Sequence, residues 1–146
     1  MKYLTIGSVT HGTMRREDLI PTFWDALREV MTKDDKAFLV EISSHQLVDN
    51  YYDSEDAEYD LEDLASRLDK HCPPYCYFGA NEGDGSDYGC WLSMDAIQDG
   101  LKSGELMLYD KMPKGYTGYV VDINDHGNVT LYKATRGRMR EIWSIV

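Results

Sequence analysis

The sequence has little cysteine, no long apolar run and, in its central part, almost no positive charge. Its three cysteines are Cys72, Cys76 and Cys90. An odd number this small excludes a disulfide framework and is typical of a reducing cytoplasm. No apolar run approaches the roughly 20 residues of a membrane-spanning helix, and the apolar run within residues 1–7 is too short for an export signal. We therefore expect a cytoplasmic protein with no membrane partner.

The sequence also lacks the local signatures of common enzyme classes. It contains no Gly-x-Ser-x-Gly, His-Glu-x-x-His or Gly-x-x-x-x-Gly-Lys pattern. The candidate acid–base residues are its four histidines, His11, His45, His71 and His126. His11 is placed best, because it follows the strand predicted at residues 2–9 and precedes Gly12, where loop side chains often carry function.

Negative charge is concentrated in the centre of the chain. The 146 residues carry a net charge of -11. Residues 1–40 carry six Lys/Arg and six Asp/Glu, residues 41–110 carry three and seventeen, and residues 111–146 carry six and three. Such a chain should repel bare nucleic acid and attract basic proteins. We expect no direct binding to nucleic acid.

Two helices are predicted from apolar residues at three- and four-residue steps. The first runs through Leu19, Phe23, Leu27 and Val30, with Pro21 in its first turn. The second spans residues 57–71, with a narrow apolar stripe and an acidic outward face, and Pro73-Pro74 ends it. The apolar run Ala37 to Ile42 predicts a buried strand between these two helices.

Strands predominate towards the C-terminus. Strands are predicted at residues 75–78, 88–92 and 105–109, and a hairpin joins 118–123 to 128–133 through Asn124-Asp125-His126-Gly127. Met139 to Val146 closes the chain as a further strand. This order predicts an α+β fold, with a twisted antiparallel sheet of C-terminal strands and two main helices packed on one face. A hydrophobic content of 42% suits one globular domain over 1–146.

The acidic stretch Asn81 to Asp87 offers one possible metal site. Asn81, Glu82, Asp84 and Asp87 could supply oxygen ligands to calcium, but their spacing is not that of an EF-hand loop. A glycine-rich turn between strands explains the same residues without a metal. We expect no metal and no cofactor, and keep Glu82, Asp84 and Asp87 as the weaker metal candidates.

The cysteines offer a second possible metal site. Cys72 and Cys76 are separated by three residues, and His71 and Cys90 would complete a zinc set. Small buried cysteines in a core explain the same pattern. Both alternatives remain open.

The run of carboxylates before and along the second helix is the predicted partner-binding surface. Carboxylates one helical turn apart lie roughly 5–6 Å from each other. An acidic helix face of this density can enter a basic nucleic-acid groove, whereas a solvated helix face is the simpler alternative. The predicted contact residues are Asp53, Glu55, Asp56, Glu58, Asp60, Glu62 and Asp63.

Three stretches of the chain resemble a family of small uncharacterised proteins of bacteriophages and prophages. They are residues 10–21, residues 77–91, and residues 122–132 together with Trp143. The resemblance covers a third to a half of the chain and implies no known activity. It implies a phage origin and a setting in the host cytoplasm.

Together these observations favour an acidic, non-enzymatic binding protein. The expected partner is a host protein with a basic surface, for example a defence or nucleic-acid-handling protein. Inhibition or modulation of that protein, with the acidic surface as a nucleic-acid mimic, is the expected role. The alternative is a small metal- or histidine-dependent enzyme, centred on His11 and the turn with Glu82, Asp84 and Asp87. The sequence does not determine an oligomeric state.

Overall fold

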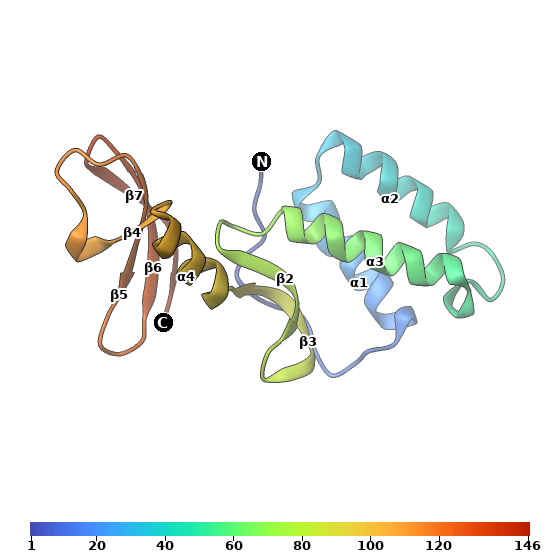
Figure 1. Cartoon of the computed structure of the whole chain (residues 1–146). Coiled ribbons are helices and arrows are strands. Elements are labelled where there is room, and N and C mark those ends of the chain that lie inside the picture. Colours follow the sequence, from blue (N-terminus) through green and yellow to red (C-terminus); the bar gives the residue numbers. More distant parts are fainter. The chain divides into compact units, whose positions relative to one another are not determined.

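A computed structural model describes all residues 1–146 of the chain. The chain divides into two compact units, residues 1–92 (unit 1) and residues 93–146 (unit 2). Unit 1 has three α-helices and one sheet, unit 2 has one α-helix and one sheet, and Figure 1 labels them along the chain. The single domain over 1–146 stays a prediction.

Unit 1 combines three helices with a three-stranded antiparallel sheet of order β1-β3-β2. Its elements are β1 (Gly7–Thr10), α1 (Arg16–Val30), α2 (Lys33–His45), a short 3-10 turn η1 (Tyr51–Asp53), α3 (Glu55–Lys70), β2 (Cys76–Asn81) and β3 (Asp84–Leu92). Helix α1 packs against α2, α3 and β1, and α3 packs against β2.

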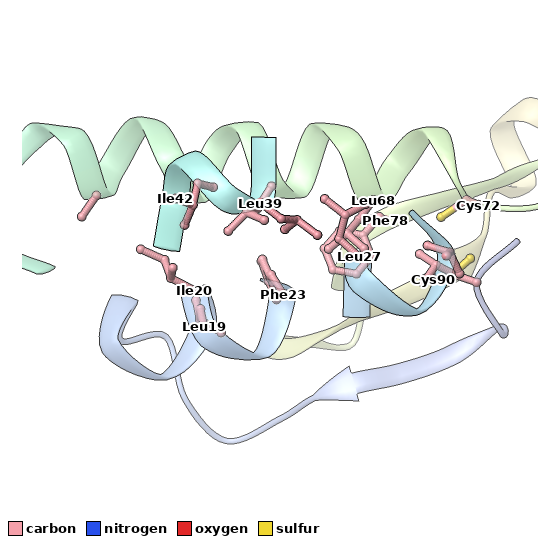
Figure 2. Packing of buried hydrophobic residues seen from close by; sticks show 14 of the residues in the cluster. Leu19, Ile20, Phe23, Leu27, Leu39, Ile42, Leu68, Cys72, Phe78 and Cys90 are labelled. Carbon is pink, nitrogen blue, oxygen red and sulfur yellow. The ribbon is translucent and has the colours of Figure 1, made fainter. Parts of the chain in front are cut away.

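The core of unit 1 lies where the helices meet the sheet. Phe23 of α1 contacts Phe78 of β2 and Tyr88 of β3 edge-on, with ring centroids 5.0 and 5.7 Å apart. Figure 2 shows Leu19, Ile20, Phe23 and Leu27 of α1 facing Leu39 and Ile42 of α2 and Leu68 of α3. These side chains are almost completely buried, so the apolar stripe predicted for the first helix is the centre of this core.

The expected strand at residues 37–42 is wrong, because this run is the middle of α2. Thr32 begins the helix with a capping box, in which its hydroxyl accepts a hydrogen bond from Asp35 N and the Asp35 carboxylate accepts one from Thr32 N. Asp35, Leu39 and Ile42 are the buried residues of α2. Their spacing of four and three residues is helical, and a strand would have buried alternate residues.

Unit 2 is a four-stranded sheet of order β4-β5-β6-β7 with one helix. Its elements are α4 (Met94–Ser103), β4 (Leu106–Leu108), a 3-10 turn η2 (Tyr109–Lys111), β5 (Gly118–Ile123), β6 (Val129–Thr135) and β7 (Arg138–Ile145). The pairs β5–β6 and β6–β7 are antiparallel, and β4 runs parallel to β5. The predicted hairpin is confirmed, with Gly127 in the left-handed region at φ 79°.

The α+β prediction is confirmed, and so are the antiparallel strands towards the C-terminus. The strands fall into two sheets, one in each unit. None of the helices combines the length and the apolar character that crossing a membrane requires.

Candidate functional site

The acidic residues of η1 and α3 form a surface of exposed carboxylates on unit 1. Ser54 caps α3, and its hydroxyl accepts a hydrogen bond from Ala57 N at 3.2 Å. Ala57, Leu64 and Leu68 are completely buried on the inner side of the helix. The carboxylates at the intervening positions therefore point to solvent. We call the exposed set the acidic face: Asp53, Glu55, Asp56, Glu58, Glu62 and Asp63.

Asp60 belongs to the predicted contact residues but lies inside the protein. Its side chain is only 10% exposed. Oδ2 accepts a hydrogen bond from the Tyr51 hydroxyl at 2.5 Å and lies 2.9 Å from Nδ1 of His45. Because its oxygen is used by two internal partners, Asp60 is not part of the acidic face.

The spacing of α3 could have revealed this role of Asp60. It lies three residues after Ala57 and four before Leu64, which places it on the buried stripe. Burial and the Asp60 carboxylate together raise the pKa of the Tyr51 hydroxyl. The hydrogen bond to Asp60 also raises the pKa of His45 above its usual 6.5.

Few cations offset the acidic face. Arg16 Nη2 lies 3.8 Å from Glu58 Oε2, which is the one ion pair that the face makes. Nη1 of the same guanidinium donates to the carbonyl oxygens of Tyr52 and Ser54, both at 3.3 Å, and so holds the chain entering α3. Tyr59 lies among these carboxylates on α3 and is 60% exposed.

A hollow of about 480 Å³ borders the acidic face at η1. Glu17, Asp49 and Asp53 bring carboxylates to its wall, and Leu47 and Val48 bring exposed apolar surface. Its other lining residues are Gln46, Asn50, Tyr51 and Tyr52. A long side chain with an apolar stem and a cationic end fits this lining, because the stem can contact apolar groups while its charge faces a carboxylate.

The acidic stretch around the β2–β3 turn is arranged differently from the prediction. Strand β3 begins at Asp84, so Asp84 and Asp87 lie on the strand. Asp84 Oδ1 accepts hydrogen bonds from Ser86 N and Ser86 Oγ, which lower the pKa of Asp84, and attraction to His11 lowers it further. Asp87 accepts a hydrogen bond from the hydroxyl of Ser8. His11 is exposed and lies near enough to interact with Asp84.

The structure brings together no group of three or more His, Cys, Asp or Glu side chains that could hold a metal ion. This applies to Glu82, Asp84 and Asp87 and also to the possible zinc set of cysteines with His71. Both nitrogens of His71 already have acceptors, with Asp35 Oδ2 2.7 Å from Nε2 and the Lys2 carbonyl oxygen 2.9 Å from Nδ1. His126 is exposed in the β5–β6 turn.

The chain matches no protein-family model, no curated protein and no solved structure.

Proposed function

We propose that this protein is a non-enzymatic binding protein that uses its acidic face to dock on a basic protein surface. The observation that carries the proposal is that six carboxylates lie exposed on η1 and α3 with one ion pair among them. The charge of the two units supports it. Unit 2 carries seven Lys/Arg and seven Asp/Glu, so the whole net charge of -11 belongs to unit 1.

The acidic face would act mainly on how fast the protein meets its partner and on how the two are oriented when they meet. Exposed ion pairs contribute only about 0–1 kcal/mol each, whereas a concentrated charge accelerates association and selects partners of opposite sign. Tyr59 lies among these carboxylates and adds a large side chain with few rotatable bonds. Tyrosine is enriched among the interface residues that contribute most of the binding energy. The hollow beside η1 would receive a lysine or arginine of the partner.

The resemblance to phage proteins suggests the kind of partner. A host protein that handles nucleic acid has a basic groove, and carboxylates one helical turn apart, roughly 5–6 Å, can occupy such a groove in place of phosphates. We therefore extend the proposal to inhibition or modulation of a host defence or nucleic-acid-handling protein in the host cytoplasm.

A pull-down from host lysate with a charge-reversed variant tests the proposal. In this variant Glu55, Asp56, Glu62 and Asp63 are changed to lysine. The matched control changes four exposed acidic residues of unit 2 to lysine, namely Asp95, Asp99, Glu105 and Asp110. Both variants change the net charge by the same amount, so a non-specific charge effect would move both.

We expect the parent and the control to recover the same host proteins at low salt and to lose them at high salt, because salt screens exposed charges. The α3 variant should recover none of them at either salt concentration. Equal recovery by the α3 variant and the parent would contradict the proposal.

One observation favours the alternative of a histidine-dependent enzyme: His11 is exposed and attracts the Asp84 carboxylate, and Asp87 lies on the same strand as Asp84. If this site binds a metal, titration of the protein with calcium, magnesium or zinc should release or absorb heat, and the bound metal should raise the melting temperature of the protein. If the parent shows neither response, and a His11→Gln variant behaves identically, only metal-free chemistry at His11 would remain for this alternative.

A further inference from the structure

The positive charge of unit 2 is concentrated on two segments that contain no carboxylate. They are residues 111–121 and residues 126–140, which include β6 and the beginning of β7. Within a chain of net charge -11, these segments carry every Lys and Arg of unit 2 except Lys102. None of their cations forms an ion pair with a carboxylate. The cations are Lys111, Lys114, Lys133, Arg136, Arg138 and Arg140.

The β6–β7 turn places two of these cations beside one hollow. Thr135 and Arg138 are paired across the two strands, and Arg136 and Gly137 connect them. A hollow of about 660 Å³ is lined by Thr135, Arg136 and Arg138. Both arginines are exposed. The hollow is therefore bounded by two guanidinium-bearing side chains and one hydroxyl-bearing side chain, without a carboxylate.

The backbone of this turn does not suit arginine. Arg136 has φ 52° and Gly137 has φ 82°. Positive φ at both central residues is the requirement of a type I′ hairpin turn, for which Asn-Gly is strongly preferred. The β-carbon of an ordinary side chain disfavours this region, and asparagine tolerates it better than arginine. Turn formation therefore does not explain why an arginine stands at position 136, and a residue held in such a conformation is a sign of a functional site.

Neighbouring backbone holds the turn in place. Arg136 N donates to the Thr117 hydroxyl oxygen at 3.0 Å, and Gly137 N donates to the Tyr116 carbonyl oxygen at 2.9 Å. Gly137 also lies against Gly115, because an added β-carbon at position 137 would lie 3.5 Å from Gly115 Cα. The backbone that carries Arg136 is thus positioned before a ligand binds, which lowers the entropy cost of binding.

The strand register adds further positive charge on the same face of the sheet. Lys133 is paired with Arg140, so two cations lie directly opposite each other on neighbouring strands, which destabilises a sheet. Since alternate residues of a strand share a face, Arg138 and Arg140 lie on this face together. Glu141 is the one carboxylate of β7 and lies on the other face. A bound anion would offset the repulsion between these cations.

We propose that the hollow at the β6–β7 turn is a binding site for a small phosphate-bearing molecule, which Arg136 and Arg138 hold through charge-assisted hydrogen bonds. The planar guanidinium group presents its donors in a geometry that matches phosphate oxygens. The Thr135 hydroxyl can donate one more hydrogen bond to the same group. The site lies on unit 2 and does not depend on the acidic face or on its partner.

The observations favour a small ligand over a strand of nucleic acid. A surface for single strands follows about 4 or more nucleotides and stacks their bases on aromatic side chains. This hollow is instead lined by one turn, and none of its three lining residues is aromatic. The net charge of -11 also repels a long polyanion more than a compact one. The volume of the hollow lies within the roughly 300–1,000 Å³ of small-molecule sites.

Titration of the isotope-labelled full chain with pyrophosphate, followed by NMR at constant ionic strength, tests the proposal. We expect saturable shifts of the Nε–H signals of Arg136 and Arg138 and of the amide signals of residues 135–138. In the double variant Arg136→Gln/Arg138→Gln the affinity should fall at least about tenfold, because both charge-assisted donors are lost. The matched control is Lys102→Gln/Lys111→Gln, which removes two exposed charges of unit 2 outside the hollow and should bind like the parent.

A single substitution, Arg136→Asn, separates binding from folding. Asparagine suits a type I′ turn better than arginine does. This variant should therefore melt at a higher temperature than the parent. Its affinity for pyrophosphate should fall at least about fivefold, because one charge-assisted hydrogen-bond donor is lost. An arginine that served only the fold would give the opposite result, with lower stability and unchanged affinity.

Three results would overturn the proposal. The first is an adventitious ion only, seen as shifts that do not saturate, that miss the turn, or that weaken equally in the lysine control. The second is unchanged affinity in Arg136→Gln/Arg138→Gln or in Arg136→Asn. The third is a single-stranded DNA oligonucleotide that binds the turn more than about tenfold more tightly than pyrophosphate, since this would assign the cations to a nucleic-acid backbone.

Discussion

His71 Nε2 lies 2.7 Å from Asp35 Oδ2, and this contact joins the end of α3 to the first turn of α2. Both side chains are buried, at 2% and 7% exposure. Arg67 Nη1 donates to the other oxygen of Asp35 at 2.9 Å. His71 also fixes the N-terminal segment, because its carbonyl oxygen accepts from Leu4 N at 2.8 Å and its Nδ1 faces the Lys2 carbonyl oxygen. One buried carboxylate thus organises three segments of unit 1.

Replacing Asp35 with asparagine should destabilise unit 1 by about 3 kcal/mol, because it removes the carboxylate that Thr32, Arg67 and the buried His71 ring all contact. Amide hydrogen exchange in α2 and α3 measures this loss in unit 1 separately from unit 2. Asp34→Asn is the control, since Asp34 is the exposed neighbour in the same helical turn. A loss below about 1 kcal/mol for Asp35→Asn would show that the network contributes little.

Acid should remove the same contribution in the parent. Burial alone would raise the pKa of Asp35, but hydrogen bonds from Thr32, His71 and Arg67 outweigh it and lower the pKa from 3.8 to about 2. A carboxyl with a lowered folded-state pKa stabilises the fold above its unfolded pKa. Unit 1 should therefore lose roughly 2 kcal/mol as the pH falls from about 4 to about 2. Unfolding measured across this range should show a shallower slope for Asp35→Asn; equal slopes would contradict the assignment.

The pKa of His45 reports the buried contact with Asp60. In the parent it should lie above the usual 6.5, since the Asp60 carboxylate stabilises the imidazolium. The raised pKa implies that this contribution to stability is present below pH about 6.5 and is lost as the pH rises through the folded-state value. Titration of the ring protons by NMR checks it. Asp60→Asn should bring the pKa of His45 down towards 6.5, and Glu41→Gln should lower it less, because Glu41 lies 3.8 Å away. An unchanged value in Asp60→Asn would contradict the contact.

Gly89 should not tolerate a side chain. A β-carbon at this position would lie 2.1 Å from the Gly7 carbonyl oxygen and 2.9 Å from Ser8 Cα, which are backbone atoms of the neighbouring strand. Gly89→Ala should therefore separate β1 from β3 and cost about 1–3 kcal/mol or more. Gly85→Ala on the same strand is the control, because its β-carbon would meet nothing within 4 Å. Thermal unfolding and amide exchange of β1 compare them, and equal stability of the two variants would be inconsistent with this close approach.

Tyr59 should contribute to partner binding without contributing to the fold. Because its side chain is 60% exposed, Tyr59→Ala should change the stability by less than about 0.5 kcal/mol. Affinity for the recovered partner should fall at least about tenfold, which corresponds to about 1.4 kcal/mol. The control is Tyr109→Ala, at a tyrosine of unit 2 that is 48% exposed. Unchanged affinity in Tyr59→Ala would remove Tyr59 from the proposed surface.

The helices were predictable where their apolar spacing was unambiguous. The stripe from Leu19 to Val30 and the one from Ala57 to Leu68 are both buried as their periods require. The run at residues 37–42 was misassigned, because a short apolar stretch fits a strand and a buried helix equally well by periodicity. The capping signal of Thr32 with Asp35 would have identified the helix.

The sequence predicted where the negative charge of the candidate site lies, but not which of its carboxylates are exposed. The acidic sequence of α3 indicates a helix whose carboxylates face solvent, and six of the seven predicted residues are exposed. Asp60 is the exception, because Tyr51 and His45 from other segments bind its oxygen.

By itself the sequence determined the α+β character of the protein, the helices α1 and α3 and the location of its negative charge, because periodicity and composition are properties of neighbouring residues. Only the tertiary structure decided which carboxylates are buried and which side chains they contact. Asp35 lies 36 residues from His71, and Asp60 lies 15 residues from His45. Such contacts depend on how helices pack and on the register of strands, and no local pattern encodes either.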